Sequence, residues 1–179
     1  MPTYVAFLRA VNVGKRQVKM DRLRKHLLDN GFSDVETHIA SGNLKVTTAS
    51  RSATKVAATL HDTISEEFGF DVPVVVRTPA QLRAAATEVD ALSSPLSTGA
   101  RVYVTFLDGV PDAAGATTLD EWDVPGERAR VHGDHLVLWL DTPSHSAKLT
   151  NTVIEKRTKR VATTRDIKVV RALAVKWGA

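Results

Sequence analysis

The chain has 179 residues, of which 43% are hydrophobic and 25% are charged, and its formal net charge is +4. These proportions are typical of an ordinary globular protein, and the length suits one large domain or two small ones. The absence of cysteine excludes a disulfide framework, thiol catalysis and iron–sulfur or zinc centres held by cysteine.

The start of the chain and its hydropathy bear on location. Residues 1–9 lack a basic lead followed by a long apolar core, so they are not typical of a secretory signal. No stretch approaches the roughly 18 consecutive apolar residues that a membrane-spanning helix needs. We therefore expect a cytoplasmic protein with no membrane partner.

Charge is unevenly distributed along the chain. Residues 1–50 hold eight Lys and Arg against four Asp and Glu, residues 51–144 hold seven against fourteen, and residues 145–179 hold nine against two. A basic end on a nearly balanced chain indicates a surface that attracts phosphate, nucleic acid or an acidic partner. The alternative is that these charges only keep an exposed helix and its loop solvated.

Residues 1–78 predict the element order β-α-β-β-α-β. Strands are expected at four β-favouring runs, residues 3–9, 35–39, 44–48 and 72–77. One helix is expected from Met20 to the stop signal Asn30-Gly31, and a second over residues 56–68, closed by Gly69. Ser41-Gly42-Asn43 is expected to form the hairpin turn between the middle strands. This order is that of a ferredoxin-like half.

The second half, residues 79–179, is expected to begin with a helix that Thr78 caps and Pro79 opens. The Ser- and Pro-rich residues 93–99 are the best candidate for a boundary segment between the halves. Strands are expected at residues 101–107, 128–131 and 136–140, the last two joined by the turn His132-Gly133-Asp134-His135. Helices are expected around Leu119 and Trp122, around Leu149 to Ile154, and from Ile167 to Trp177 with Thr164 as N-cap. The chain therefore predicts an α+β protein with two similar halves in tandem.

Three motifs resemble those of a known family. They are Phe7-Leu8-Arg9-Ala10-Val11-Asn12-Val13-Gly14 with Val18-Lys19-Met20, then Ile39-Ala40-Ser41-Gly42-Asn43-Leu44, and then Lys148-Leu149-Thr150-Asn151 with Glu155-Lys156 and Ala162-Thr163-Thr164-Arg165-Asp166. In this order and spacing the chain resembles the family catalogued as domain of unknown function 1697. The resemblance implies two ferredoxin-like halves and no established activity. The chain departs from the family pattern at Ala10 and Lys15, where the family usually has glycine.

The loop at residues 12–16 follows a predicted strand and precedes a predicted helix, where backbone amides and basic side chains are able to hold an anion. Arg9 at the end of the strand adds a guanidinium suited to phosphate or carboxylate, and Lys19 adds another cation. The loop lacks the Gly-x-x-x-x-Gly-Lys-Ser/Thr pattern of a P-loop. The alternative is a crossover loop in which Gly14 only permits a positive φ angle.

No catalytic residue is predicted. Ser41 and His38 lie three residues apart across a strand end, so their side chains are expected on opposite faces, and no acidic partner is placed by sequence. Ser41 is most simply a turn residue. The six histidines never show a compact metal-binding spacing. His132 and His135 flank one hairpin, but two such residues without a nearby carboxylate pair predict no metal site, and no cofactor is expected.

The C-terminal region supplies a second set of candidate ligand-binding residues. The full candidate set is Arg9, Asn12, Gly14, Lys19, Ser41, Asn43, Lys148, Asn151, Lys156 and Arg165. We expect these residues to converge on one electropositive pocket. The alternative for the C-terminal members is an ordinary polar helix face.

Nucleic acid is a weaker candidate partner. Ferredoxin-like RNA-binding modules stack bases on exposed strand aromatics. Here the strand at residues 44–48 has no aromatic residue, and Tyr4 and Phe7 alternate to opposite faces of the first strand. Sequence-specific RNA binding is therefore not favoured, whereas weak, non-specific, phosphate-driven binding fits the charge.

We expect a cytoplasmic protein of unknown function that binds a small ligand bearing phosphate or carboxylate. The alternative is a nucleic-acid or protein interaction module without catalysis. A third interpretation is an enzyme acting on an anionic substrate, with Lys19 or Lys156 stabilising developing charge. No general base stands out in the motifs, so whether the protein is an enzyme stays open.

Overall fold

A computed structural model describes residues 1–96 and 99–179, which fold into two compact units. The first unit comprises Met1–Arg83 and Leu173–Ala179, and the second comprises Ala84–Ala172. Ser97 and Thr98, which belong to the predicted boundary segment, lie outside the described residues. In the described chain, no helix combines the length and the apolar character that crossing a membrane requires.

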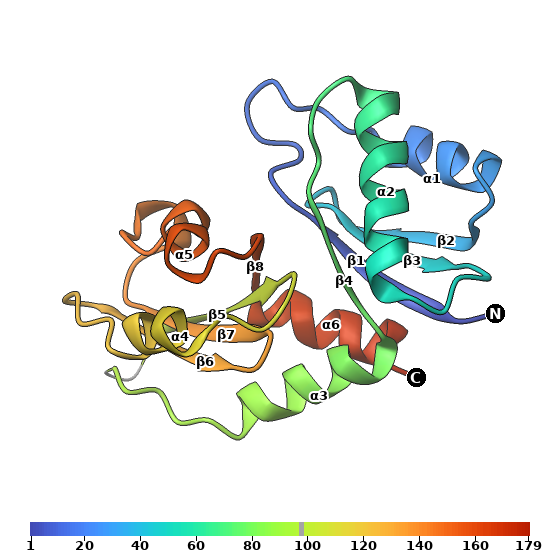
Figure 1. Cartoon of the computed structure of the whole chain (residues 1–179). Helices are drawn as coiled ribbons and strands as arrows, with labels where there is room; N and C mark the ends of the chain where they lie inside the picture. Colours follow the sequence, from blue (N-terminus) through green and yellow to red (C-terminus); the bar gives the residue numbers. More distant parts are fainter. Residues whose placement is uncertain (97–98) are drawn as a thin grey trace. The chain divides into compact units, whose positions relative to one another are not determined.

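The first unit is a four-stranded antiparallel sheet with two helices on one face (Figure 1). Its elements are β1 (Thr3–Leu8), α1 (Met20–Asp29), β2 (Ser33–His38), β3 (Asn43–Thr47), α2 (Ala53–Phe68) and β4 (Val74–Arg77). The strands lie in the order β2-β3-β1-β4. This is the ferredoxin-like arrangement, which confirms the fold expected for this half.

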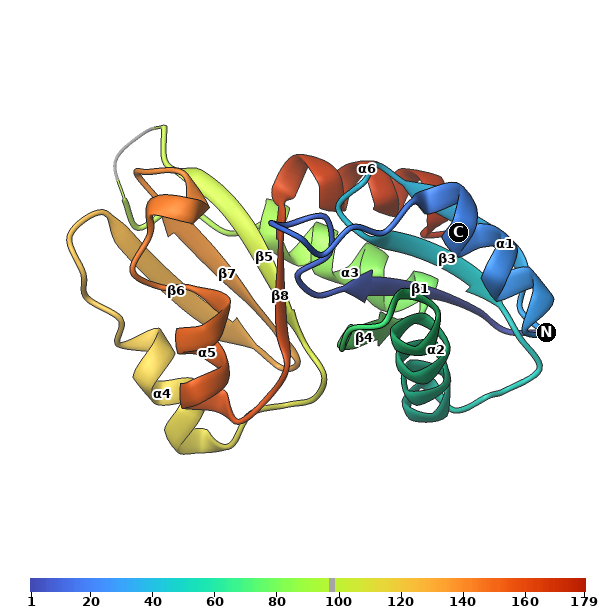
Figure 2. The ribbon, with the colours of Figure 1, turned by 90° about the horizontal axis from the view of Figure 1, so that it is seen from above.

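The second unit repeats the arrangement. Its elements are β5 (Arg101–Leu107), α4 (Ala113–Asp120), β6 (Glu127–His132), β7 (His135–Leu140), a short 3-10 helix at Ser144–Ser146, α5 (Asn151–Thr158) and β8 (Ala162–Asp166). The strand order is β6-β7-β5-β8, and α4 and α5 lie side by side against the sheet (Figure 2). The predicted α+β fold with two ferredoxin-like halves is therefore confirmed.

Side chains of β1 project alternately to the two faces of the first sheet, and both faces are buried. Tyr4, Ala6 and Leu8 pack with the apolar stripes of α1 and α2 in one core. Val5 and Phe7 point to the opposite face and are also fully buried. A strand buried on both faces needs apolar side chains at successive positions, as the sequence of β1 has.

Two further helices, α3 (Pro79–Asp90) and α6 (Ile167–Trp177), cross the border between the units. Thr78 Oγ1 accepts a hydrogen bond from the amide of Gln81 at 3.2 Å, and Gln81 Oε1 accepts one from the amide of Thr78 at 2.8 Å. This reciprocal capping box confirms that Thr78 caps α3.

The end of α6 belongs to the first unit. The sequence predicts a division at residue 78, whereas the compact units divide after Arg83, and the C-terminal residues 173–179 belong to the first unit. The contacts of Trp177 account for this placement. Its Nε1 donates to Glu36 Oε2 at 3.0 Å, and its ring meets that of His38 edge-on.

One strand of the second unit is not predicted from the sequence. Ala162–Asp166 forms β8 and pairs with β5, and the hydroxyls of Thr164 and Thr105 lie 2.7 Å apart across the pair. The prediction that Thr164 caps α6 is therefore wrong. Asp166 lies directly before α6, and its Oδ1 accepts a hydrogen bond from the amide of Lys168 at 2.8 Å. A short, polar strand carries little hydropathy signal, and its pairing with β5 decides its conformation.

The repeat between the two units includes a pair of equivalent buried arginines. Arg77 in β4 pairs with Val5 of β1, and Arg165 in β8 pairs with Val104 of β5. Both arginines are buried, and each donates from Nη1 to the carbonyl oxygen of the residue before it, at 2.8 and 2.9 Å. We found no direct repeat in the sequence, so the equivalence becomes visible only in the paired strands.

Candidate functional site

Asn12 organises the loop between β1 and α1. Its Nδ2 donates to the carbonyl oxygens of Val18 at 3.1 Å and Ala40 at 2.6 Å, while its Oδ1 accepts from the amide of Val18 at 2.8 Å. Both amide hydrogens and the carbonyl oxygen of the side chain are therefore engaged in the protein. Asn12 was predicted to bind a ligand, and its contacts give it a positioning role.

The two segments joined by Asn12 are unusually rich in left-handed backbone. Positive φ angles occur at Ala10 (54°), Asn12 (55°), Gly14 (59°), Ile39 (51°) and Gly42 (82°). Such angles cost little at glycine and more at alanine, and at a β-branched residue such as isoleucine they are uncommon. A Cβ added at Gly42 would lie 2.7 Å from Val11 Cγ2. The sharp turn therefore requires glycine at this position.

A hollow opens where the loop leads into α1. It has a volume of about 630 Å³, and we call it the α1 hollow. Its lining residues are Asn12, Gln17, Val18, Lys19, Met20, Asp21, Arg22 and Ala40. It thus brings together two of the residues predicted from the sequence, Asn12 and Lys19.

The first turn of α1 faces this hollow without a side-chain cap. Lys19 occupies the N-cap position and makes no capping hydrogen bond, because its side chain is a donor and the helix start needs an acceptor. Within the described residues, the structure gives no acceptor to the amides of Met20, Asp21 and Arg22. The amide of Leu23 makes the first helical bond, to the carbonyl oxygen of Lys19 at 3.0 Å.

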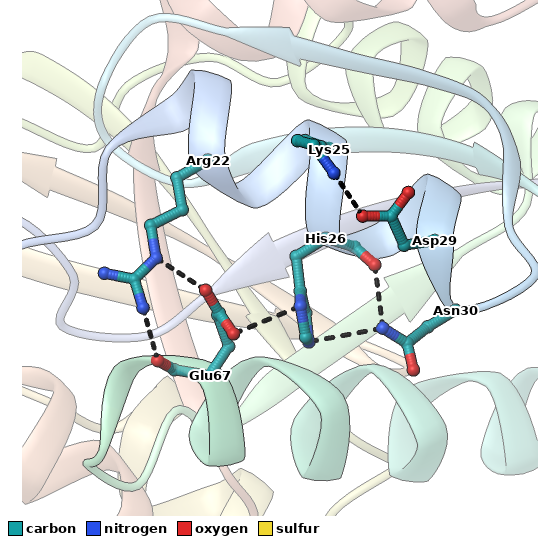
Figure 3. A network of polar contacts seen from close by, with 6 residues as sticks. All are labelled: Arg22, Lys25, His26, Asp29, Asn30 and Glu67. Carbon is teal, nitrogen blue, oxygen red and sulfur yellow. Dashed lines mark hydrogen bonds and ion pairs between the residues drawn. The ribbon is translucent and has the colours of Figure 1, made fainter.

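The other charges near the hollow are committed to ion pairs. Arg22 donates from Nε to Glu67 Oε1 at 2.5 Å and from Nη2 to the carbonyl oxygen of Glu67, and His26 Nδ1 lies 3.1 Å from Glu67 Oε2 (Figure 3). The hydrogen bond from Arg22 is the main reason why the pKa of Glu67 is lowered. Asp21 pairs with Arg24 on the same helix.

Lys19 differs from its charged neighbours. Its side chain is exposed, and in the part of the chain that the structure describes it has neither a hydrogen bond nor an ion pair. Among the described residues, the α1 hollow is therefore lined by one ammonium group without an ion pair and by three backbone amides without a hydrogen-bond acceptor. This arrangement favours the binding of an anion.

The remaining candidates of the first unit lie outside this lining, as far as the described residues extend. Asn43 is buried and donates from Nδ2 to the carbonyl oxygen of His38 and to Ser41 Oγ, both at 3.0 Å. These bonds hold the turn between β2 and β3, so the predicted hairpin turn is confirmed. Arg9 is half-buried, and its backbone amide bonds to the carbonyl oxygen of Pro73.

In the second unit, Asn151 and Arg165 are held by neighbouring threonines. Thr164 donates to Asn151 Oδ1 at 2.6 Å, while Arg165 Nη1 donates to Thr163 Oγ1 at 2.8 Å. Desolvation by burial lowers the pKa of Arg165 to about 10. Lys148 and Lys156 are exposed, and Lys148 lines a different hollow beside Glu127. It stays a prediction that the four second-unit candidates, Lys148, Asn151, Lys156 and Arg165, share one pocket with those of the first unit.

Two carboxylates in the second unit were not identified from the sequence. Glu127 is buried and accepts hydrogen bonds from Trp122 Nε1 at 3.2 Å and from the amides of Lys148 at 2.6 Å and Leu149 at 3.0 Å. These bonds tie the segment before α5 to β6. The sequence shows only a charged residue immediately before the strand predicted at residues 128–131, which does not indicate this role.

Glu88 of α3 meets the two histidines of the β6–β7 hairpin. Its Oε1 lies 2.8 Å from His132 Nδ1 and its Oε2 lies 3.1 Å from His135 Nε2. The two rings stack with 5.9 Å between their centroids, so they face each other as the hairpin prediction allowed. Among the described residues, no group of three or more metal-binding side chains is arranged to hold a metal ion.

Residues 1–136 match the family model described as "Protein of unknown function (DUF1697)". The chain belongs to this family. The resemblance noted in the sequence is thereby confirmed, although its third motif, from Lys148 onward, lies beyond the matched residues.

A solved structure similar to this DUF1697 protein is that of the conserved bacterial protein SP0830 from Streptococcus pneumoniae. The two share 22% sequence identity and a TM-score of 0.74, and the comparison covers 100% of this chain and 99% of that one. At this identity the likeness shows the fold alone, and that fold agrees with two tandem α+β halves. No functionally curated protein matches the chain.

Proposed function

We propose that this DUF1697 protein binds a small ligand bearing phosphate or carboxylate, and that the α1 hollow takes the anionic group. The observation that carries the proposal is the uncapped start of α1 beside the exposed ammonium of Lys19. An oxyanion at this position would accept hydrogen bonds from the amides of Met20, Asp21 and Arg22 and would lie at the positive end of the helix dipole.

Lys19 adds a mobile point charge to these fixed donors. It is held at the mouth of the hollow because Val18 before it is anchored to Asn12 through both its amide and its carbonyl group. Asn12 therefore acts as a positioning residue, since it fixes where the loop ends and α1 begins. The carboxylate of Asp21 repels an anion at this point, and its ion pair with Arg24 weakens that repulsion.

Weak binding to nucleic acid is the second candidate. The first unit holds thirteen Lys and Arg against eight Asp and Glu, so it is the more basic of the two. Contacts to phosphates through such a surface weaken steeply as salt concentration rises, because they depend on counterion release. A binding constant for mixed oligonucleotides that is insensitive to salt would exclude this candidate.

The first proposal is tested by following backbone amide NMR signals while inorganic phosphate or acetate is added at constant ionic strength. We expect saturable shifts at residues 19–22. Lys19→Ala should weaken binding by about fivefold, and Asp21→Asn should strengthen it by a factor of about three, since each changes one charge next to the anion.

Lys55→Ala is the matched control, because Lys55 is an exposed lysine on the neighbouring helix α2. It should leave the affinity unchanged. Equal losses for Lys19→Ala and Lys55→Ala would show that only overall charge matters, and shifts absent from residues 19–22 would contradict the proposed site.

A further inference from the structure

A second hollow runs along β6, the edge strand of the second sheet, and we call it the β6 hollow. Its volume is about 350 Å³. The lining that matters here consists of Leu92, Pro95, Asp120, Arg128, Arg130 and Trp139. All of these residues belong to the second unit, so this hollow is separate from the α1 hollow.

Arg128, Ala129 and Arg130 of β6 all line the hollow, and the pleat of the strand sends their side chains to alternating faces. Ala129 and Val131 pack into the core beneath α4 and α5, so Arg128 and Arg130 project to the other face of the strand. Trp139 of β7 pairs directly with Arg128 in the antiparallel register and projects to the same face. Two guanidinium groups and one indole therefore share this face.

Arg128 is already neutralised by the protein. Its Nη1 donates to the carbonyl oxygens of Val124 at 2.9 Å and Glu127 at 2.7 Å, and its Nη2 lies 2.6 Å from Asp123 Oδ1. Asp120 is also committed, because its Oδ1 accepts a hydrogen bond from the amide of Val131 at 2.7 Å. Arg128 is thus balanced by an ion pair, whereas Asp120 keeps its negative charge and opposes an anion at its own side of the hollow.

Arg130 is exposed, and within residues 1–96 and 99–179 its guanidinium has no hydrogen bond and no ion pair. An uncommitted guanidinium presents a flat fork of donors that matches the oxygens of a carboxylate or phosphate. The β6 hollow therefore has a donor group for an oxyanion at the side where Arg130 lies.

Apart from Ser93, Asp120 and the two arginines, the lining is apolar. Trp139 is 4% exposed, so its ring is held rigidly by its surroundings. Leu92 and Pro95, from the segment after α3, contribute apolar surface to the same hollow. A volume of this size falls within the roughly 300–1,000 Å³ typical of small-molecule sites, in which apolar walls surround a few polar anchors.

We infer that the β6 hollow binds a small molecule that combines a flat aromatic ring with an oxyanion. The ring lies against Leu92, Pro95 and the part of Trp139 that reaches the hollow, where apolar and aromatic contacts are favourable. The oxyanion accepts paired hydrogen bonds from Arg130. Aromatic carboxylates and nucleoside monophosphates share this chemistry.

The test measures binding of four probes by backbone amide NMR: benzoate, cyclohexanecarboxylate, adenosine 5′-monophosphate and inorganic phosphate. We expect saturable shifts around residues 129–131 with benzoate or adenosine monophosphate. Cyclohexanecarboxylate and inorganic phosphate should bind at least about tenfold more weakly, because each lacks either the flat ring or the apolar body. Comparison of the two ring-bearing probes distinguishes a carboxylate ligand from a nucleotide.

Arg130→Gln should reduce the affinity for the ring-bearing probe by at least about tenfold, and Arg130→Lys should restore it only in part, since lysine lacks the fork. Lys168→Gln, which removes an exposed charge elsewhere in the second unit, should have no effect. Lys19→Ala should also have none, so failure of the first-unit site is distinguishable from failure here. Equal binding of phosphate and benzoate, unchanged binding by Arg130→Gln, or no saturable binding of either ring-bearing probe would overturn the inference.

Discussion

Asn12 Nδ2 lies 2.6 Å from the carbonyl oxygen of Ala40, so one side chain connects the loop after β1 to the turn before β3. The same amide group also closes the loop on itself through Val18. Segments 28 residues apart in the chain therefore share one anchor, next to the hollow proposed to bind an anion.

Replacing Asn12 with alanine should destabilise the protein by about 2 kcal/mol. The change removes three hydrogen bonds, leaves the backbone groups of Val18 without their partner and places alanine at a φ of 55°. Urea unfolding measures the loss. Gln17→Ala, in the same loop, removes a single exposed bond to Gly14 and should cost less than about 0.5 kcal/mol. Equal costs would mean that Asn12 does not anchor the loop.

Replacing Ile39 with asparagine or glycine should stabilise the protein by about 1 kcal/mol. Ile39 has a φ of 51° and is 53% exposed, so the change relieves backbone strain and loses little burial. Ala10→Gly should have a smaller effect of the same sign, because alanine is less strained than isoleucine at positive φ. Val13→Asn is the control, because it changes an exposed apolar residue in the loop that contains Ala10. It should not stabilise the protein. Thermal unfolding of the variants measures these differences.

Glu36 should make folding stability depend on pH in the acid range. Hydrogen bonds from Lys45 and then from Trp177 lower its pKa from 4.5 to about 2. The stabilisation is therefore complete above pH 4.5 and is lost as the pH falls toward 2. Because the side chain is 40% exposed, we expect Glu36→Gln to cost only about 1 kcal/mol at neutral pH and to flatten this dependence. Unfolding curves at several pH values test it, with Glu66→Gln as an exposed glutamate control on α2.

His61 should act in the opposite direction. Asp71, 2.7 Å from its Nε2, and then Asp62, 2.8 Å from its Nδ1, raise its pKa above the ordinary 6.5. Its contribution to stability is present in full below pH 6.5 and is lost as the pH rises through the raised pKa. In an NMR titration, Asp71→Asn should lower the pKa of His61 more than Asp62→Asn does. The reverse order would show that Asp71 is not the main partner.

Much of the first unit could be predicted because its signals are local. Apolar side chains recur every three or four residues in α1 and α2, Gly69 permits the left-handed end of α2, and Gly42 permits the turn before β3. Ala162–Asp166 was not predicted as a strand because it is short and mostly polar. Its conformation depends on pairing with β5, which lies more than 50 residues earlier.

The candidate sites also combine features that are local in the sequence with features that depend on residues distant in the chain. The sequence places Asn12 and Lys19 in one loop, but it cannot show that all the polar atoms of the Asn12 side chain are used internally while Lys19 stays uncommitted. It likewise gives no indication that Arg128 is neutralised and Arg130 is not, although the two lie two residues apart on the same strand. Such differences depend on neighbours distant in the chain.

The α+β class, the β-α-β-β-α-β order of the first half and the family resemblance follow from local sequence signals, because periodicity, caps and turn residues act over a few positions. The tertiary structure alone decided the strand β8, the return of the last residues of α6 to the first unit, and which charged side chains remain uncommitted. The physical reason is that pairing, burial and neutralisation of charge are set by groups that only folding brings together.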